Sequence, residues 1–486
     1  MTNASTGKDN FIKNFDLWDT SQINAAKEVI KKIKSLDLDV LRISFPDQHG
    51  ILRGKTIMAS EVLSAFSNGI SMVTTLLAKD TSHKTVFPWF TEGGGFKLEE
   101  MTGGGDFLMI PDPKTFRVLP WAKKTGWILA DIYFPNGKPV PFSTRQILRN
   151  AVTEVNNKGY EYCSGLEIEF HLFKLEDPKL MPNQAGQPPE PPEVSLLAHG
   201  FQYLTEQRMD ELDPYLETLR EHLTKLELPL RTLEVEFGPS QIEITFDPRN
   251  GIESADNMIL FRNAVKQIAH RQGLHATFMC RPNLPNLFSS GWHLHQSLID
   301  LKTKKNAFIP EKVDETLSQI GLKFIAGLLK HAQGSSIFTT PTINGYKRYQ
   351  PYSLAPDRVL WGKDNRGAML RAIGGVKDKT TRIENRMGEP TANPYLYLAS
   401  QIYSGLDGID NKLTPTIPVD AAYDTEAEML PKSLMEAVNA LRSDHYLIQK
   451  FGAQFCDYIL HIKEAEISRF LSTVTDWEHK EYFEIF

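Results

Sequence analysis

The segment SGLEIEFHLF, which begins at Ser164, constrains the fold more than any other part of the sequence. It places Glu167 and Glu169 two residues apart, beside apolar Leu166 and Ile168. Side chains at i and i+2 of a strand lie on the same face, so both carboxylates face one space. Two buried, unneutralised carboxylates would cost several kcal/mol each. A divalent cation balances them, one acid stays protonated, or this face of the strand is open to water.

The same period-two pattern recurs in three later segments. These segments carry Glu234, Glu236 and Glu243 in RTLEVEFGPSQIEITF, His293 and His295 in GWHLHQSL, and Glu384 between Arg382 and Arg386 in RIENR. Four strands that present Glu, Glu, His and Glu on one side predict the wall of a metal-binding funnel. A lone His293 would more often be a core histidine, and the spacing does not show which imidazole would contact a metal.

Composition narrows the class of protein. A chain of 486 residues with 41% hydrophobic and 23% charged residues predicts an ordinary globular protein with two domains. The net charge of −6 argues against a nucleic-acid partner, and no apolar run approaches the length of a membrane span. Three scattered cysteines indicate neither a disulfide framework nor a zinc site, so we expect a cytoplasmic protein.

Turn and cap signals predict the organisation of the chain. The turn-rich segment PNGKPVP at 135–141 predicts a boundary, which gives an N-terminal arm and helix over 1–36, a small domain over 37–136 and a large domain over 141–486. Ser21 is the expected N-cap of the first helix, and Asp213 with Pro214 the expected start of another. A further amphipathic helix is expected from about Ser254 to Gln272.

Arginines cluster between residues 344 and 386 and alternate with apolar side chains. They include Arg348, Arg366, Arg371, Arg382 and Arg386. A run of charges is usually a solvated face, but this alternation predicts partial burial against anionic partners. Carboxylates that hold metal beside such arginines are the apparatus of phosphoryl transfer from a nucleotide. Oxygen ligands with one imidazole favour Mg²⁺ or Mn²⁺.

Six motifs in register give the sequence a family resemblance. EIEF, EFGPSQIE, SGWHLHQSL, NGYKR, DNR and RIENR, in this order, resemble the glutamine synthetase family, on the branch that joins glutamate to amines. The resemblance implies an α+β fold, with an N-terminal β-grasp domain and a catalytic α/β domain whose curved antiparallel sheet forms an active-site funnel. It also implies a homo-oligomer, commonly a dodecamer of two stacked hexameric rings with sites between subunits.

The resemblance assigns roles to individual residues. Glu169, Glu236 and Glu243 would hold one metal, and Glu167, His293 and Glu384 the metal on the nucleotide phosphates, with about two or three ions per site. Arg348 and Arg386 would bind glutamate, Arg366 and Arg371 would contact the phosphates, and His295, Ser297 and Arg382 would complete the nucleotide site. Asp47 matches an acid that a neighbouring subunit contributes. The implied reaction uses ATP to phosphorylate L-glutamate, and an amine then attacks the acyl phosphate.

One loop departs from the ammonia-using members. Those members carry a glutamate in a loop that closes over the site. In this chain the matching position is Leu354. Ammonium needs anionic neighbours, so we expect an organic amine. Ser289 and Trp292 replace a Gly and a Met of the family pattern and imply a reshaped pocket. With Tyr349 and Tyr352 nearby, a neutral, aniline-like amine is favoured, although the aromatic residues also suit ordinary core packing.

Alternatives remain open at this point. Ammonia-dependent glutamine synthesis would need another acid, such as Asp357, and a polyamine or ethanolamine would favour acids at the entrance. A structural relative without catalysis is a further alternative, although all six metal-ligand positions are intact. Tyr423 lies near a position that is adenylylated in some members, but its surroundings predict no such control.

Overall fold

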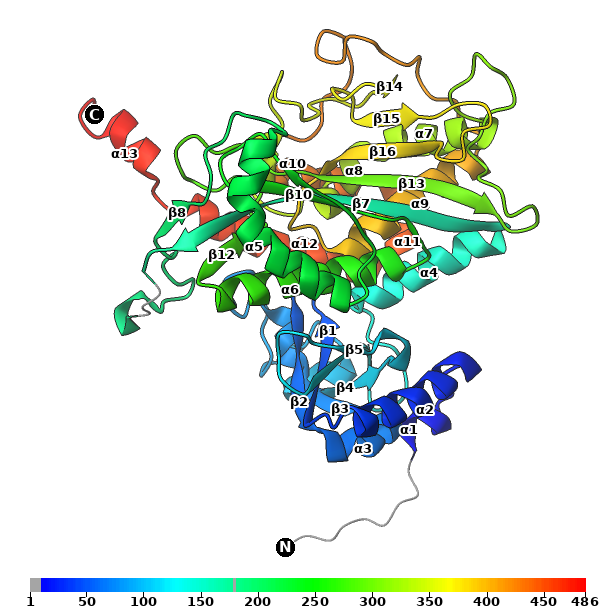
Figure 1. The fold of residues 1–486 in the computed structure, drawn as a ribbon, viewed down its shortest axis with the longest axis vertical. Coiled ribbons are helices and arrows are strands. Elements are labelled where there is room, and N and C mark those ends of the chain that lie inside the picture. The colour runs from blue at the N-terminus through cyan, green and yellow to red at the C-terminus, as the bar shows by residue number, and fades with distance from the viewer. Residues whose placement is uncertain (1–9, 178–180) are drawn as a thin grey trace, which may run out of the picture.

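Two β-sheets organise the chain, one in each half of the view in Figure 1. The computed structural model describes residues 10–177 and 181–486. Residues 1–9 of the expected N-terminal arm therefore lie outside the described residues. The α+β fold class predicted from the sequence is confirmed. No helix in the described ranges is long and apolar enough to cross a membrane, and the three cysteines are free thiols.

The first sheet has the strand order β2-β1-β6-β4-β3, with β5 paired to β6. Its strands are β1 (Val40–Pro46), β2 (Leu52–Met58), β3 (Ile70–Val73), β4 (Asp106–Pro111), β5 (Arg117–Val118) and β6 (Thr125–Tyr133). β1 runs antiparallel to β2 and parallel to β6. The helices α1 (Phe11–Asn14), α2 (Thr20–Ser35) and α3 (Val62–Asn68) accompany it. Val29 and Ile33 of α2 pack against Leu41 and Ile128 of the sheet.

The second sheet is built around the long strand β7 (Tyr160–Leu175), in the order β14-β15-β16-β13-β7-β10-β9. Its other strands are β8 (Val194–Leu196), β9 (Leu230–Val235), β10 (Gln241–Phe246), β11 (Arg249–Asn250), β12 (Leu274–Thr277), β13 (Trp292–Asp300), β14 (Trp361–Lys363), β15 (Leu370–Ile373) and β16 (Arg382–Gly388). Every pair along this path is antiparallel except β14 with β15.

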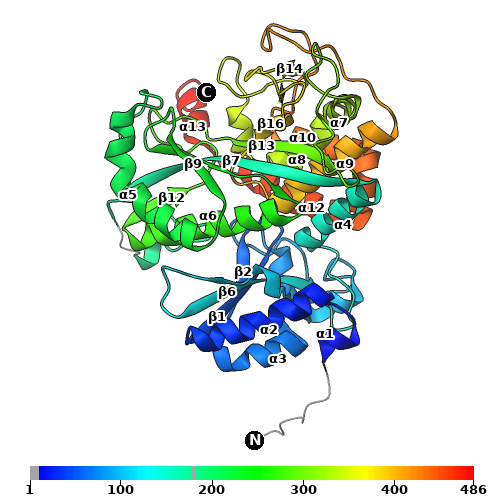
Figure 2. The same ribbon diagram turned by 45° about the vertical axis from the view of Figure 1, so that its right-hand side comes forward.

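The helices α4, α6 and α12 lie on the side of this sheet that faces the first sheet (Figure 2). The helices of this half are α4 (Thr144–Asn157), α5 (Glu206–Lys225), α6 (Glu253–Arg271), α7 (Gln319–Lys330), α8 (Ala332–Thr339), α9 (Pro394–Asp410), α10 (Leu434–Ser443), α11 (His445–Phe451), α12 (Ala453–Leu471) and α13 (Asp476–Tyr482). α4 and α6 contact β7 directly, and α9 contacts both helices. The helices thus leave the opposite face of the sheet to polar residues.

Two helix starts differ from the sequence-based predictions. α2 begins after Asp19, whose carboxylate accepts from the backbone of Gln22 in a capping box, so Ser21 lies inside the helix. α5 begins at Glu206 and carries Pro214 in its interior. Pro214 interrupts the hydrogen bonding, but a stripe of buried leucines runs through the whole helix, so tertiary packing outweighs the local breaker.

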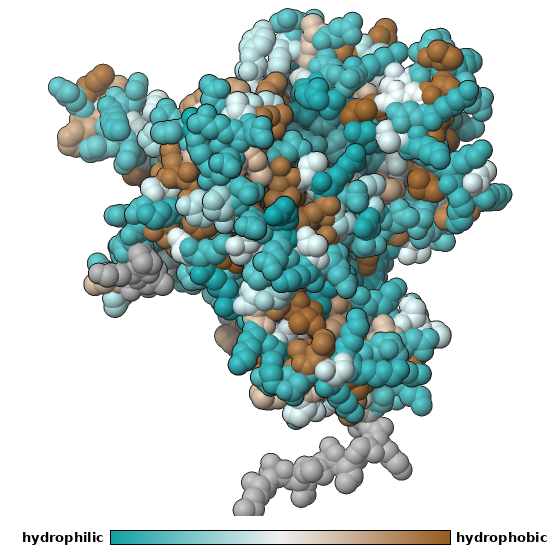
Figure 3. All heavy atoms as spheres, viewed as in Figure 1, coloured by the Kyte–Doolittle hydropathy of each residue, from teal (hydrophilic) through white to brown (hydrophobic). Residues whose placement is uncertain are grey.

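The C-terminal helix α13 extends away from the body of the molecule (Figure 1). Hydrophobic side chains gather at its tip on an otherwise mainly hydrophilic surface (Figure 3). The exposed apolar residues of this end are Val474, Trp477, Tyr482, Phe483, Ile485 and Phe486. The segment from Val474 onwards therefore exposes apolar area that residues 10–177 and 181–473 do not cover.

Arg145 joins the two sheets through a buried network of charges. Its guanidinium, which is 1% exposed, contacts Asp112 at 2.9 Å and Asp131 at 3.0 Å on the first sheet, and Asp256 of α6 at 2.7 Å. Burial opposes the charge on Asp112, but Arg145 and Arg149 outweigh it and hold the pKa of this carboxyl below its usual range. One arginine therefore neutralises carboxylates from both halves of the chain.

Arg145→Met should lower the free energy of unfolding by about 3–5 kcal/mol, because it leaves buried carboxylates without their cation. Chemical denaturation would measure the loss. The matched control is Arg442→Met, which removes an ion pair with Glu464 that is about half exposed and should change stability by about 0–1 kcal/mol. Equal effects of the two substitutions would contradict the buried network.

Candidate active site

The strand β7 presents its two carboxylates as the alternation predicts. Leu166 and Ile168 are buried against the helices, whereas Glu167 and Glu169 lie on the opposite face. Glu169 is 9% exposed and accepts hydrogen bonds from the backbone N–H of Gly291 at 3.0 Å and from Gln241 Nε2 at 3.1 Å. The face is therefore polar but largely withdrawn from water.

Strand register brings the predicted ligands together. His293 of β13 lies opposite Glu167, and Glu243 of β10 lies opposite Glu169. Glu384 of β16 lies opposite His295. The four strands β16, β13, β7 and β10 thus form a continuous wall of carboxylates and imidazoles, as the sequence predicts.

Distances within the wall define two groups that could hold a metal ion. Glu167 with His295 and Glu384 forms one, and Glu167 with Glu243 and His293 forms the other; within each group the ligand atoms lie within 4.8 Å of one another. His293 Nδ1 is 2.5 Å from Glu167 Oε1, and His295 Nε2 is 2.9 Å from Glu167 Oε2. Both imidazoles, rather than His293 alone, therefore contact the shared carboxylate.

Glu236 and Glu169 complete the acidic wall. Glu236 follows the end of β9, and its Oε2 accepts from the backbone N–H of Phe237 at 2.9 Å. Its charge raises the pKa of Glu169, which places it close to that carboxylate. His293 Nε2 lies 3.8 Å from Glu169 Oε1. All six predicted ligand positions therefore border one space.

The electrostatics of the wall differ between its two sides. Burial, followed by the neighbouring acids, raises the pKa of Glu243 to about 11, that of Glu169 to about 8 and that of Glu236 to about 7. On the other side, burial opposes the charge on Glu384, but Arg386, His293 and His295 together outweigh it and lower the pKa of Glu384 to about 2. Burial raises the pKa of Glu167, but His293 and His295 together lower it by more. The pKa of Glu167 therefore lies well below its usual range.

The donor set fits a hard divalent cation. Glu169, Glu236 and Glu243 repel one another and have raised pKa values, so a bound cation would relieve an existing penalty. Carboxylate oxygens with imidazole nitrogen are ligands of Mg²⁺ and Mn²⁺. These residues are therefore suited to hold metal.

A pocket of about 510 Å³ adjoins the wall on its arginine side. It is lined by Glu167, His295, Ser297, Arg366, Arg371 and Arg382, together with other residues. Arg371 Nη1 is 3.0 Å from Glu384 Oε2, and Arg382 Nε donates to His295 Nδ1 at 3.0 Å. All the residues predicted to contact nucleotide or phosphate therefore share one cationic pocket.

The two arginines predicted to bind glutamate are buried beside the wall. Arg348 donates through Nη1 to the carbonyl of Arg386 at 3.0 Å, and its Nη2 lies 3.4 Å from His293 Nε2. Arg386 pairs with Glu384 and donates to the carbonyl of Leu354 at 3.3 Å. Both guanidinium groups thus stand where the acidic wall meets the loop that carries Leu354.

Comparison with known proteins agrees with this geometry. A family model for the catalytic domain of glutamine synthetase matches residues 141–482. The chain belongs to the glutamine synthetase family. It is 44% identical to a γ-glutamylanilide synthase from Acinetobacter sp, over 98% of this chain and 99% of that relative. It is 31% identical to a glutamine synthetase from Methanosarcina mazei, over 94% and 97% of the two chains.

A solved structure has the same fold. A structure described as apo GmaS without ligand matches with a TM-score of 0.77 and 27% identity, and the match covers 94% of this chain and 99% of that one. The family resemblance and fold predicted from the sequence motifs are therefore confirmed. Glutamine synthetases use ATP and divalent metals, which agrees with the acidic wall and its cationic pocket.

The aromatic residues predicted to line an amine pocket are placed differently. Trp292 is fully buried and packs edge-to-face on Tyr397, because it points to the opposite side of β13 from His293. Tyr349 is buried too, and its hydroxyl donates to the carbonyl of Met387 at 2.8 Å. Tyr352 is 75% exposed. The prediction that Trp292 lines the substrate pocket is therefore wrong, and strand alternation explains why.

The remaining positions fall on loops. Leu354 is 64% exposed, with a backbone φ of 60°. Ser289 is half-buried, and its carbonyl accepts from Gln241 Nε2 at 3.3 Å. Asp357 is buried and held by Arg358, with Nε 2.7 Å from its Oδ1. Asp357 is therefore already paired with a cation in this subunit, and its role in place of the loop glutamate stays a prediction.

Asp47 lies apart from this wall. It occupies the turn between β1 and β2, where it pairs with Arg53 at 2.7 Å and accepts from the backbone N–H groups of His49 and Ile51. It is not among the residues that line the cationic pocket or form the two metal-ligating groups. Its contribution to the site of a neighbouring subunit stays a prediction.

Sequence reasoning missed a group of aromatic side chains at the edge of the wall. The aromatic cluster consists of Phe201, Tyr203, Phe237 and Phe288, whose rings contact one another. Phe237 directly follows Glu236 in the sequence, and this adjacency could have placed Phe237 beside the wall. Phe201 and Tyr203 lie on the loop before α5 and Phe288 lies on the loop before β13, and no periodic pattern connects the two loops.

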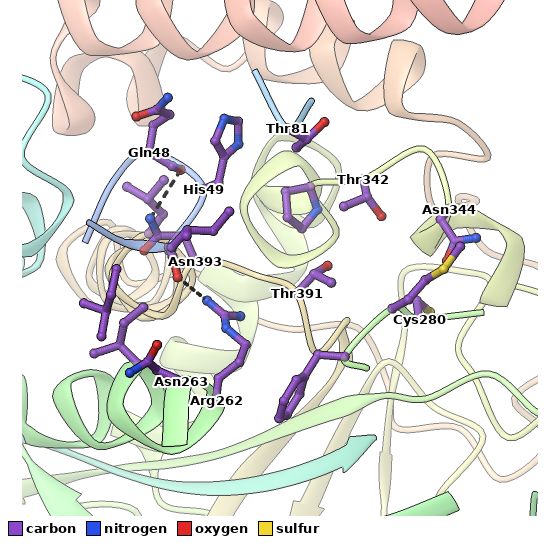
Figure 4. Close-up of a pocket in the computed structure, with 18 of the residues that line it drawn as sticks. Gln48, His49, Thr81, Arg262, Asn263, Cys280, Thr342, Asn344, Thr391 and Asn393 are labelled. Carbon is purple, nitrogen blue, oxygen red and sulfur yellow. Dashed lines mark hydrogen bonds between the residues drawn. The ribbon is translucent and has the colours of Figure 1, made fainter. Parts of the chain in front are cut away.

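A separate cavity of about 750 Å³ lies between the β1–β2 turn and the helices α6, α8 and α12 (Figure 4). Arg262 lines it and donates to the carbonyl of Gly50 at 2.6 Å, and Asn393 Nδ2 donates to that of Gln48 at 3.3 Å. None of the predicted metal ligands lines this cavity. These hydrogen bonds hold the turn that carries Asp47 against the second sheet's helices.

Glu243→Gln should abolish most of the stabilisation that Mn²⁺ gives the folded protein. Metal at about 100 times its dissociation constant stabilises a folded protein by about 2.7 kcal/mol, and the variant lacks a central ligand. The folded pKa of Glu243 is raised, so its ionisation destabilises the metal-free wild type as the pH rises towards that value. In chelator at alkaline pH the variant should therefore be at least as stable as wild type.

Thermal unfolding with and without Mn²⁺ would measure both effects. Glu253→Gln is the control, because this exposed carboxylate lies on α6 and pairs with Arg249. An undiminished response of Glu243→Gln to Mn²⁺ would exclude Glu243 as a ligand.

Proposed function

We propose that this protein is an ATP-dependent ligase that joins the γ-carboxylate of L-glutamate to an organic amine, with an aniline-like arylamine as the preferred substrate. The observation that carries the proposal is the acidic wall, with both metal-ligating groups, directly beside an arginine-lined pocket. The 44% identity to a γ-glutamylanilide synthase, against 31% to a glutamine synthetase, supports an amine other than ammonia.

The proposed reaction has two steps, phosphorylation of glutamate and attack by the amine. A γ-carboxylate oxygen of glutamate attacks the γ-phosphorus of ATP, and ADP leaves. The amine nitrogen then attacks the acyl carbon, phosphate leaves and the nitrogen loses one proton. Bound Mg²⁺ or Mn²⁺, which we place as two or three ions at Glu167, Glu169, Glu236, Glu243, His293 and Glu384, would neutralise phosphate and carboxylate oxygens.

Arginines supply the rest of the charge complementarity. Arg366 and Arg371 in the cationic pocket are placed to contact the phosphates, with His295, Ser297 and Arg382 around the nucleotide. Arg348 and Arg386, at the junction with the Leu354 loop, are placed to hold glutamate carboxylates. Their burial in a confined site also excludes water, which would hydrolyse the acyl phosphate.

Leu354 supports the choice of amine. An arylamine is largely uncharged at neutral pH, so it attacks without a nearby acid that attracts and deprotonates it. Leu354 offers no such acid, and Asp357 is neutralised by Arg358. Ammonium would be bound poorly under these conditions.

Phosphate release from ATP, with Mg²⁺ and L-glutamate, tests the proposal across ammonium, ethanolamine, putrescine, isopropylamine and aniline. Aniline should give the highest kcat/KM. Ammonium as the best substrate would return the protein to glutamine synthesis, and ethanolamine or putrescine as the best would replace the arylamine. No stimulation by any amine would indicate a structural relative without catalysis.

Leu354→Glu should raise the kcat/KM for ammonium relative to that for aniline by about tenfold, equivalent to about 1.4 kcal/mol. The new carboxylate attracts ammonium, while the backbone carbonyl that accepts from Arg386 is unchanged. Leu63→Glu is the matched control, since Leu63 is similarly exposed on α3. An unchanged ratio would show that this position does not select the amine.

We also propose that subunits assemble as a homo-oligomer, a dodecamer of two hexameric rings, in the cytoplasm. The exposed apolar side chains at the end of α13 support assembly, because such area is normally covered. The proposed domains are a β-grasp domain over 37–136 and a catalytic domain over 141–486, and Asp47 is proposed to act across the subunit interface. Native mass spectrometry would give the number of subunits.

A further inference from the structure

The aromatic cluster at the edge of the acidic wall is exposed. Phe201 and Tyr203 are each 50% exposed, and Phe237 and Phe288 are each 39% exposed. Ring centroids are 4.8 Å apart between Phe237 and Phe288, and 5.7 Å between Phe201 and Phe288, in edge-to-face geometry. Four large rings that keep this much surface in water form an apolar patch that the described residues of this subunit leave uncovered.

The backbone of the cluster is fixed to the acidic wall. Phe237 donates its backbone N–H to Glu236 Oε2 at 2.9 Å, and its carbonyl accepts from the N–H of Phe201 at 2.8 Å. The cluster therefore begins one residue from a carboxylate that borders the metal site. Its position is set by the same strand end that positions Glu236.

Gln241 makes the second connection. Its Nε2 donates to Glu169 Oε2 at 3.1 Å and to the carbonyl of Ser289, next to Phe288, at 3.3 Å. Its Oε1 accepts from the N–H of Gly238, next to Phe237, at 2.9 Å. One buried side chain thus holds the loops of both phenylalanines against Glu169.

The charges around Tyr203 agree with this placement. After burial, the carboxylates of Glu236, Glu243 and Glu234 raise its pKa to about 12. The tyrosine hydroxyl therefore lies close enough to the acidic wall to interact electrostatically with its carboxylates. The aromatic cluster therefore adjoins the carboxylates of the wall.

We propose that Phe201, Tyr203, Phe237 and Phe288 form the subsite for the aryl group of the amine substrate. This inference rests on the proposed function and names the residues that select its amine. An aryl ring seated against these four rings replaces ring–water contacts by ring–ring contacts. The amino group of such a substrate would then point along the wall towards the glutamate held by Arg348 and Arg386.

The cluster suits an arylamine better than the other amines of the class. A polyamine or ethanolamine carries charge or hydroxyl groups that four apolar rings would desolvate without a partner. Ammonium has no apolar group to bury. The subsite therefore discriminates by ring contact, whereas Leu354 acts by withholding a charge.

The test compares amines in the same variant. Phe288→Ala and Phe201→Ala should each lower kcat/KM for aniline by about tenfold, while kcat/KM for ammonium changes less than about twofold. Phe288→Tyr, which keeps the ring, should restore most of the activity with aniline. Phe90→Ala is the control, because Phe90 is 84% exposed and does not belong to the cluster.

A binding measurement separates this inference from the proposed function. In the presence of Mg²⁺ and ATP, saturation-transfer NMR should show that aniline contacts the wild-type protein. The signal should be weaker with Phe288→Ala. An equal loss of activity with every amine, or an altered number of subunits, would make the cluster a structural or interface element and overturn the inference. Aniline binding that the variants do not change would overturn it as well. If aniline binds at the cluster but stimulates no phosphate release, only the proposed ligase activity is overturned.

Discussion

Repulsion between buried carboxylates is the constraint on which the second sheet depends. Glu169, Glu236 and Glu243 have pKa values raised by burial and by one another. Regular antiparallel pairing forces them together, since the register places Glu243 opposite Glu169. A sheet with this sequence therefore carries an unfavourable charge density on one face, and binding of cations is the physical means to relieve it.

The same wall is polarised along its length. On the β16 side, Arg371 and Arg386 already neutralise Glu384, while the β10 side has no such partner among the described contacts. Negative phosphates suit the arginine side, and metal ions suit the acidic side. The aromatic cluster continues the acidic side into an apolar rim, so three kinds of chemistry follow one another across a single sheet.

How far the sequence predicts this arrangement depends on the period of the pattern. Strand alternation at period two correctly predicts that Glu167, Glu169, His293 and Glu384 converge. The same rule places Trp292, which directly precedes His293, on the opposite face of its strand. The comparison with the family pattern, by contrast, assigns this position to the pocket. Phe201 and Phe288 could not be predicted, because loops bring them together and loops carry no period. Pro214 shows the opposite case, in which a buried leucine stripe outweighs a local helix breaker.

Arg145 has a consequence for how the chain folds. Asp112 and Asp131 belong to the first sheet, whereas their cation comes from α4, after the turn-rich segment that separates the two sheets. A fragment that ends before α4 would lack both the guanidinium that these two carboxylates contact and the helices that cover them. The buried ion pairs therefore couple the two sheets energetically across the boundary visible in the sequence.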